Sequence, residues 1–319
     1  MQTPQQHVWI DTDMGFDDLA AVLTVRAQPE WVIDGMTLVA GNAPLPVVQD
    51  NALRSAHYFG WRFPIHAGAA LPLSCALVTA QDILGADAMQ SAGRQLPSAH
   101  APLASANGVD ALIAYLAAVQ HPATLLTLGP LTNLALVLQQ RPDLAARVGQ
   151  LVWMGGSAGP GNHTAAAEFN AAVDPEAVQV VLDHALPLQM VGLDACRQVR
   201  VHAADAVTLR ALGSDRAALL ADLLLAYVRI ASPDGSRPMA LYDPTAAAAL
   251  VRPACMQFRP AHMVMECAGH HTRGMTVVEW RVPRKAKANV QVASVADEEQ
   301  VRDTVLQALA LAAHGKERA

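Results

Sequence analysis

Short apolar runs alternate with segments of helical spacing along much of the chain, and this alternation restricts the fold more than any other feature. The predicted strands are His7–Ile10, Gly35–Ala40, Phe63–Ala67, Ala123–Leu128, Gln150–Met154 and Leu188–Leu193. The predicted helices between them are Asp17–Gln28, Val47–Phe59, Val109–Gln120, Leu131–Gln140 and Asp174–His184. Strands that alternate with helices pair mainly in parallel. The sequence therefore predicts an α/β fold with an open, mainly parallel central sheet flanked by helices.

The later part of the chain is less regular. We expect helices near Ala217–Ile230 and Pro244–Leu250, a hairpin from Met256–Cys267 and Gly274–Arg281, a strand at Val290–Ala293 and a helix at Glu298–Ala313. The segment Gly68–Asn107 is rich in Ala, Pro and Ser, and we expect it to be a mobile loop or lid. Because no repeat or linker divides the sequence, residues 1–319 are expected to form one domain.

The composition of the chain restricts the binding partners and the cellular compartment that we expect for the protein. The net charge of -6 gives no reason to expect nucleic acid or an anionic membrane as a partner. The apolar stretch at residues 217–231 is broken by Asp222 and Arg229, so it is expected to be a buried helix and not a membrane span. The N-terminus lacks the pattern of a signal peptide, and the four cysteines (Cys75, Cys196, Cys255 and Cys267) form no C-x-x-C pair. We therefore expect reduced thiols in a cytoplasmic protein.

Four aspartates follow the first predicted strand within eight positions: Asp11, Asp13, Asp17 and Asp18. In a parallel sheet the active site lies beyond the carboxyl ends of the strands. The later strands are followed there by Asn42, by Leu128, by Met154 and by a loop with Asn162, Glu168 and Asn170. Such oxygen ligands suit calcium or magnesium, and a divalent cation would offset the repulsion between the aspartates. The lack of a Cys/His set argues against zinc.

The segment DTDMGFDD resembles the N-terminal signature of the inosine-uridine nucleoside hydrolases, usually written D-T-D-P-G-x-D-D, with Met14 in place of the proline. Further segments occur in the family's order: Gly41-Asn42, LGPLTNLAL (Leu128–Leu136), the MGG that begins at Met154, AEFNAAVDPEA (Ala167–Ala177) and YDPTA (Tyr242–Ala246). The resemblance implies a Rossmann-related core and calcium-dependent hydrolysis of the N-glycosidic bond of ribonucleosides. It also implies a homodimer or homotetramer.

The resemblance implies a role for each matching residue. Ca²⁺ would be held by Asp13, Asp18, Asp243 and the backbone carbonyl of Leu128. Asp13 would take a proton from the attacking water. The sugar would be bound by Asp17, Asn42, Glu168 and Asn170 at its hydroxyls, by Asn162 at the 5′-hydroxyl and by Met154 beneath the ring. Asp11 would support the site from behind.

The sequence departs from the family where the leaving base would be protonated. Tyr242 stands where many members have the His presumed to be the acid. A phenol with its usual pKa of about 10 is a weaker acid than imidazolium, although its ring can stack on a base. The family's His-Gly segment is also replaced, by residues 79–82. The candidates to take the place of the missing His are His163, Arg237 and Trp153.

Plainer interpretations and two other functions stay open on the sequence alone. Asp17 and Asp18 can cap a helix, and Asn42 can be a turn residue. A magnesium-dependent phosphatase also places D-x-D after its first strand, but Lys285, Lys287 and Lys316 all lie late in the chain, where they do not fit its pattern. A non-catalytic nucleoside or ribose binder on the same scaffold would accommodate the Tyr242 replacement. We favour the nucleoside hydrolase.

Overall fold

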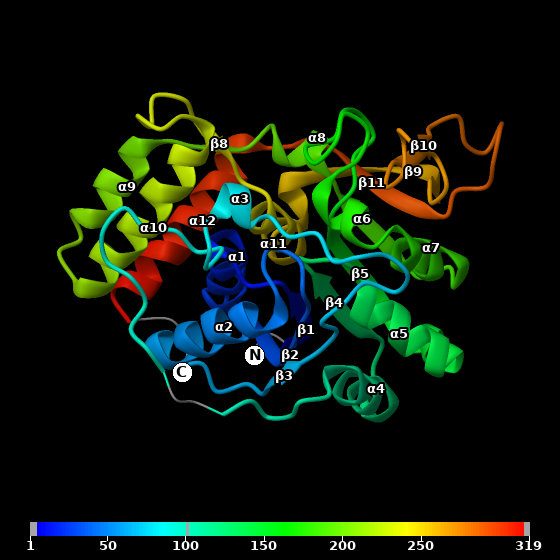
Figure 1. Cartoon of the computed structure of the whole chain (residues 1–319), viewed down its shortest axis with the longest axis horizontal. Helices are drawn as coiled ribbons and strands as arrows, with labels where there is room; N and C mark the ends of the chain where they lie inside the picture. The colour runs from blue at the N-terminus through cyan, green and yellow to red at the C-terminus, as the bar shows by residue number, and fades with distance from the viewer. Residues whose placement is uncertain (1–4, 100–101, 316–319) are drawn as a thin grey trace.

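A nine-stranded sheet forms the centre of the molecule, with the strand order β10-β9-β11-β6-β5-β4-β1-β2-β3 (Figure 1). The computed structural model describes residues 5–99 and 102–315. The strands are β1 Gln6–Thr12, β2 Trp31–Leu38, β3 Ile65–Ala67, β4 Ala123–Thr127, β5 Val148–Met154, β6 Leu188–Val191, β9 Met256–Met265, β10 Thr276–Glu279 and β11 Val290–Ala296. Every pairing from β3 across to β11 is parallel, whereas β9 runs antiparallel to β11 and β10. The predicted α/β architecture is confirmed.

Two hydrophobic cores cover the two faces of the sheet. Val8 and Ile10 of β1 belong to one core and Trp9 to the other, because successive strand residues point to opposite faces. The first core includes residues of α1 Phe16–Arg26, α2 Leu45–Phe59, α9 Ala203–Arg210, α10 Asp215–Ala231, α11 Asp243–Val251 and α12 Glu298–Ala313. The second includes residues of α4 Gly108–Ala118, α5 Thr132–Gln140 and α7 Pro175–Asp183. The labels in Figure 1 show these two groups at opposite sides of the sheet.

Short elements complete the chain. They are α3 Gln81–Leu84, α6 Phe169–Val173, α8 Leu193–Cys196, the two 3₁₀ turns Pro142–Arg147 and Pro253–Cys255, and the two-stranded sheet of β7 Arg200–Val201 and β8 Met239–Ala240. Apart from α3, the described part of the segment Gly68–Asn107 forms no helix or strand, as expected for a loop. None of the helices in the described ranges is both long and apolar enough to cross a membrane. The expectation of one domain over residues 1–319 stays a prediction.

Strand β2 begins at Trp31, four residues before the predicted start at Gly35. Asp34 interrupts the apolar pattern there, which concealed the first half of the strand. Its carboxylate lies 2.7 Å from Nδ1 of His7 and accepts a 3.0 Å hydrogen bond from the hydroxyl of Tyr115. The polar residue is therefore compatible with a strand because its partners lie on β1 and α4.

Candidate active site

Asp18 is fixed at the junction between β1 and α1. Gly15 is the N-cap of α1, and its backbone N–H donates to Oδ2 of Asp18 at 2.7 Å. The hydroxyl of Thr12, the last residue of β1, donates to the other carboxylate oxygen. The side chain of Asp18 is fully buried. The sharp strand-to-helix connection therefore holds this carboxylate in one place.

Asp13 lies between the ends of three neighbouring strands. The backbone N–H of Asn42, beyond β2, donates to its Oδ2 at 2.7 Å. A Cβ added at Gly41 would lie 2.1 Å from that oxygen, and one added at Gly129, beyond β4, would lie 3.1 Å from Oδ1. Glycine is thus required at Gly41 because the backbone approaches the Asp13 carboxylate so closely.

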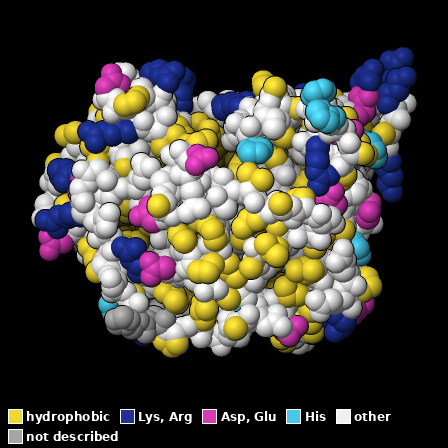
Figure 2. Space-filling view, viewed as in Figure 1, with side chains coloured by type: hydrophobic (Ala, Val, Ile, Leu, Met, Phe, Trp, Pro, Cys, Tyr) yellow, Lys and Arg dark blue, Asp and Glu magenta, His cyan; other side chains and the backbone are white. Residues whose placement is uncertain are grey.

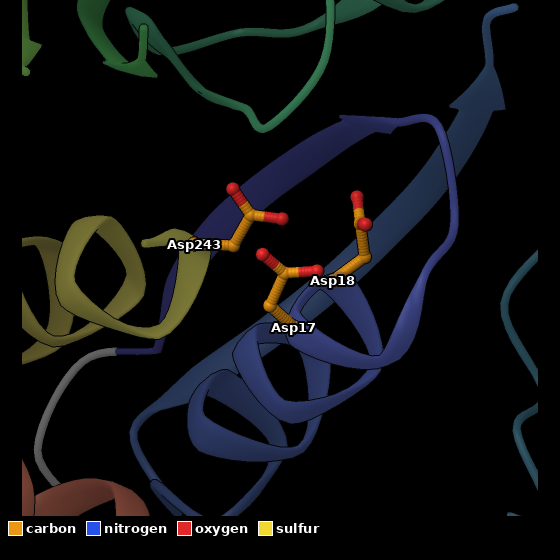
Figure 3. A group of neighbouring side chains, drawn as sticks. All are labelled: Asp17, Asp18 and Asp243. Carbon is orange, nitrogen blue, oxygen red and sulfur yellow. The ribbon is translucent and has the colours of Figure 1, made fainter. Parts of the chain in front are cut away.

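A third carboxylate comes from a distant part of the chain. Asp243 begins α11, and it meets the first turn of α1 so that one oxygen each from Asp17, Asp18 and Asp243 lies within 4.8 Å of the others. Figure 3 shows these three side chains pointing toward a common space. Asp13 stands beside this group, since its negative charge acts on Asp243. The four aspartates therefore form one cluster.

Glu168 and Asn170 come from the start of α6. The carboxylate of Glu168 caps that helix, accepting hydrogen bonds from the backbone N–H groups of Asn170 at 2.8 Å and Ala171 at 3.0 Å, and it also accepts from Gly156 at 2.8 Å. The amide of Asn170 donates to the carbonyls of Leu128 at 2.7 Å and Met154 at 3.0 Å. These bonds join α6 to the ends of β4 and β5.

A cavity of about 400 Å³ opens over these groups. It is lined by ten residues that the sequence singled out: Asp13, Asp17, Asn42, Leu128, Met154, Asn162, Glu168, Asn170, Tyr242 and Asp243. Asp18 lies buried beneath them. A larger hollow of about 800 Å³, beside the starts of β5 and β6, has no carboxylate among its described lining residues. The structure thus brings the residues predicted to bind the metal and the sugar, together with Tyr242, to one place.

Further residues complete the walls of the cavity, and of these only His163 and the segment 79–82 had been named from the sequence. They are Val78, Thr79, Ala80, Asp82, Ile83 and Leu84 around α3, His163 and Phe169 beside α6, Tyr227 and Ile230 of α10, and Met239 of β8. Most are apolar or aromatic, and an apolar residue in a loop or helix carries no pattern that marks it as part of a site. The cavity therefore has a polar floor and a largely apolar mouth.

Burial dominates the electrostatics of the floor. It raises the pKa of Asp13 and of Asp243 well above the usual range, and the negative charge of Asp18 raises both further. Burial likewise raises the pKa of Asp17 to about 7, with a further rise from Asp18. It also raises the pKa of Glu168 to about 7, against the lowering effect of its backbone hydrogen bonds. A cation among these groups would favour their ionised forms.

The described lining of the cavity carries no permanent positive charge. Among the described residues that line the cavity there is neither Lys nor Arg. On the face shown in Figure 2 the basic side chains lie mostly toward the edges, and the middle is mainly hydrophobic and uncharged. The donor set of the cluster consists of carboxylates without Cys or His, which suits a hard divalent ion. The acidic cluster can therefore hold a metal.

Asp11 lies outside the cavity and is buried behind it. Its Oδ2 accepts hydrogen bonds from the hydroxyl of Thr37 and, at 2.7 Å, from the amide of Asn133. Asn133 also donates to the carbonyl of Leu38 at 3.1 Å and accepts from the N–H of Ala69 at 2.8 Å. The carboxylate of Asp11 thus ties β1 to the start of α5 and the end of β2, in agreement with a supporting role.

The comparisons with known proteins agree with this geometry. A family model described as "Inosine-uridine preferring nucleoside hydrolase" matches residues 8–303, which is most of the chain. The protein belongs to the nucleoside hydrolase family. The resemblance inferred from its motifs is confirmed, and so is the expectation that it is an enzyme of the N-ribohydrolase class.

Relatives match this nucleoside hydrolase over nearly their whole length. The chain is 36% identical over 309 residues to the non-specific ribonucleoside hydrolase RihC of Escherichia coli, covering 96% of this chain and 98% of the relative. It is 33% identical over 286 residues to the pyrimidine-specific ribonucleoside hydrolase RihA of Salmonella agona, covering 89% and 91%.

Solved structures match the fold closely. The purine-preferring ribonucleoside hydrolase from Gardnerella vaginalis aligns with a TM-score of 0.88 at 24% identity, covering 97% of this chain and 99% of the other. The plant nucleoside hydrolase PpNRh1 aligns with a TM-score of 0.88 at 27% identity, covering 96% and 99%. The architecture of this nucleoside hydrolase is therefore that of its family.

The three candidates for the missing His have different positions. Trp153 is fully buried in the second core and donates to the carbonyl of Gly129 at 3.3 Å. Arg237 donates to the carbonyl of Ala231 and is not among the residues lining the cavity. His163 lines the cavity. Of the three, His163 alone has its side chain at the site.

We predict that Gly41→Ala disables the site without unfolding the protein. The added methyl group would displace the Asp13 carboxylate, so we expect weaker divalent-metal binding and at least about a 100-fold loss of kcat/KM. Isothermal titration with Ca²⁺ and ribose release would measure the two effects. Gly60→Ala is the control, because nothing lies within 4 Å of its added Cβ and only the positive φ of 67° is strained. Equal metal binding by both variants would contradict the prediction.

We predict that the metal-free protein becomes less stable as the pH rises. Asp17 and Glu168 have pKa values raised to about 7, so between about pH 4 and pH 7 the native state binds more protons than the unfolded state. The free energy of unfolding then decreases as the pH rises through this window. In EDTA we expect a Tm several degrees higher at pH 5.5 than at pH 7.5, measured by calorimetry. Saturating Ca²⁺ should remove this difference, and a Tm in EDTA that rises with pH would refute the prediction.

Proposed function

We propose that this protein hydrolyses the N-glycosidic bond of ribonucleosides in a calcium-dependent reaction that yields ribose and the free base. The observation that carries the proposal is the convergence of four aspartates with Glu168 and the amides of Asn42 and Asn170 at the floor of one cavity. The activities for which its relatives are named agree with it.

The metal would be held by Asp13, Asp18 and Asp243 with the backbone carbonyl of Leu128. Asp17 is the carboxylate grouped most closely with Asp18 and Asp243, and it lines the cavity, where it can also reach a sugar hydroxyl. Calcium accepts six to eight oxygen ligands in irregular geometry, which suits a set that mixes carboxylates and a carbonyl. When bound, a divalent cation lowers the pKa of a coordinated water.

Asp13 is proposed as the base that takes a proton from the attacking water. Its carboxylate lines the cavity and is an oxygen base within reach of a bound water. The N–H of Asn42 fixes one oxygen at 2.7 Å, so the orientation of the carboxylate is set before substrate arrives. A proton acceptor whose carboxylate is already oriented does not have to change its orientation during the reaction.

The remaining polar groups of the floor would bind the sugar. Asp17, Asn42, Glu168 and Asn170 are assigned to the ribose hydroxyls, Asn162 to the 5′-hydroxyl and Met154 to the underside of the ring. Cleavage of a glycosidic bond builds positive charge on the sugar, and the surrounding carboxylates favour that charge. A deoxysugar would leave buried polar groups unpaired, so ribose should be strongly preferred.

Tyr242 is assigned to the base end of the cavity. Burial raises its pKa to about 12, so its phenol stays protonated and is a poor proton donor. The side chains of Ile83, Leu84 and Ile230 line the same cavity and offer apolar contact to a planar base. We assign to Tyr242 a stacking contact and a hydrogen bond to the base.

The phosphatase and the non-catalytic binder explain fewer features of this cavity. A phosphatase would need positive charge near its phosphate, and the described lining of the cavity has no Lys or Arg. A protein that only bound nucleosides would not require a proton acceptor whose carboxylate is as completely oriented as that of Asp13. A homodimer or homotetramer and a cytoplasmic location remain expectations from the resemblance and the sequence.

We predict ribose release from ribonucleosides that depends on Asp13. The purified protein would be incubated with calcium and inosine, adenosine, guanosine, uridine, cytidine, xanthosine or p-nitrophenyl riboside, and ribose would be assayed as reducing sugar. Asp13→Asn should lower kcat by at least about 100-fold, because it removes the base while nearly keeping the shape. Binding of nucleosides without turnover by the wild type would favour the binder, and phosphate release from phosphoesters would favour the phosphatase.

We predict that Tyr242 acts through its ring more than through its hydroxyl. Tyr242→Phe keeps the ring and should lower kcat/KM for inosine by less than about 10-fold, whereas Tyr242→Ala should raise KM by a larger factor. Calcium content must be measured for both variants because Asp243 is the next residue. A loss of about 100-fold or more in Tyr242→Phe, with calcium content intact, would show that the hydroxyl takes part in the chemistry.

A further inference from the structure

Besides the carboxylates assigned to the metal and the sugar, four titratable side chains line the cavity: Asp82, His163, Tyr227 and Tyr242. A purine or pyrimidine leaves more easily when a proton reaches it as the glycosidic bond breaks. The following inference rests on the proposed ribohydrolase function and asks which of these groups supplies that proton.

Two of the four groups are unsuited to proton donation. Tyr227 is buried, and its hydroxyl already donates to the carbonyl of Ala240 at 2.8 Å. Its burial also raises its pKa well above the usual range. Tyr242 carries a phenol, which is ordinarily a much weaker acid than imidazolium. Neither phenol transfers a proton readily near neutral pH.

Asp82 is a poor candidate for a different reason. It lies exposed on α3, a helix of only four residues. Exposed carboxyl groups are ionised near neutral pH, so they attract protons and cations more than they donate protons. Asp82 can favour a cationic partner in the cavity, but it is not a source of the proton.

His163 is the only imidazole among the described residues that line the cavity. Imidazole is the side chain that ordinarily changes charge between about pH 5 and 8, which allows it to donate a proton and to recover it from solvent. Its ring lies 5.6 Å from that of Phe169 in an edge-on contact, and both rings line the cavity. His163 is exposed, so solvent can reprotonate it.

The loop that carries His163 is held by its own backbone. The N–H groups of Asn162, His163 and Thr164 all donate to the carbonyl of Ala167, at 3.1, 3.1 and 3.2 Å. Arg197 donates to the carbonyls of Pro160 and Gly161, each at 2.8 Å. The imidazole therefore projects from an anchored turn.

We propose that the imidazolium of His163 protonates the leaving base. As the bond between C1′ and the base nitrogen breaks, its electron pair passes into the base, and the ring N–H of His163 gives its proton to a base nitrogen. The water oxygen bonds to C1′ and its proton passes to Asp13. His163 is left neutral and Asp13 protonated, and exchange with solvent restores both, so that water is the only other reactant.

The charges around His163 are compatible with this role. Asp82, Glu168 and Tyr242 line the same cavity, and the guanidinium of Arg197 lies at the base of the loop. Two carboxyl groups and one guanidinium therefore lie around the loop that carries His163.

The test compares substrates that need the proton with one that does not. In His163→Gln, kcat/KM at pH 7 should fall by at least about 100-fold for inosine or uridine, but by less than about 3-fold for p-nitrophenyl riboside, whose leaving group is stable as an anion. In the wild type the rate on inosine should decline at alkaline pH, and this decline should be absent in the variant. His270→Gln, in the turn between β9 and β10, is the matched control and should behave as wild type.

Other outcomes would overturn the assignment. Equal losses on inosine and on the nitrophenyl compound would mean that His163 positions the sugar or the loop. An unchanged rate on inosine would show that the proton comes from elsewhere. His163→Ala, with its Tm measured, provides a second variant should the Gln substitution disturb the turn. If the wild type cleaves no riboside at all, the proposed function fails as well, and the nitrophenyl assay identifies that case.

Discussion

The buried carboxylate cluster is the constraint on which the rest of the site depends. Asp13, Asp18 and Asp243 are almost completely buried, and burial and mutual repulsion both oppose their ionisation. Backbone N–H groups of Gly15 and Asn42 offset part of this cost. The remainder is left for a divalent cation, since the described lining has neither Lys nor Arg. An arrangement this costly without a metal is best explained by the binding of one.

The parallel part of the sheet brings the cluster together because β1, β2, β4 and β5 all end at the same edge. β1 delivers Asp13, β2 leads to Asn42, β4 to Leu128 and β5 to Met154. Asn170 then links the last two strands through their carbonyls. Only Asp243 comes from outside this series, carried by the first turn of α11 against α1. Most residues of the cavity floor therefore come together because the strands that precede them are parallel neighbours in the sheet.

The sequence predicted the regular elements and the floor of the site, and it failed where no pattern exists. The helix Glu298–Ala313 has the predicted bounds, because its apolar period is uninterrupted. Helix α9 and strands β7 and β8 were not predicted, since they are short and lack clear periodicity. The apolar mouth was missed for a similar reason: nothing in the sequence distinguishes Ile83 or Met239 from ordinary packing residues. Motifs locate polar chemistry, whereas the shape of an apolar wall depends on the folded chain.

The division of the cavity into a polar floor and an apolar mouth is relevant to the preference for one nucleobase over another. The relatives that match this chain are named for pyrimidine-specific, non-specific and purine-preferring activity. Under the proposed function the floor would bind the ribose, which every ribonucleoside has, so it would give little basis for such differences. The mouth is built from α3, the His163 loop and the end of α10, which are surface segments around the sheet edge. If the base binds at the mouth as proposed, substitutions there would change the contacts to the base without disturbing the aspartates, and base preference could vary while the ribose site is retained.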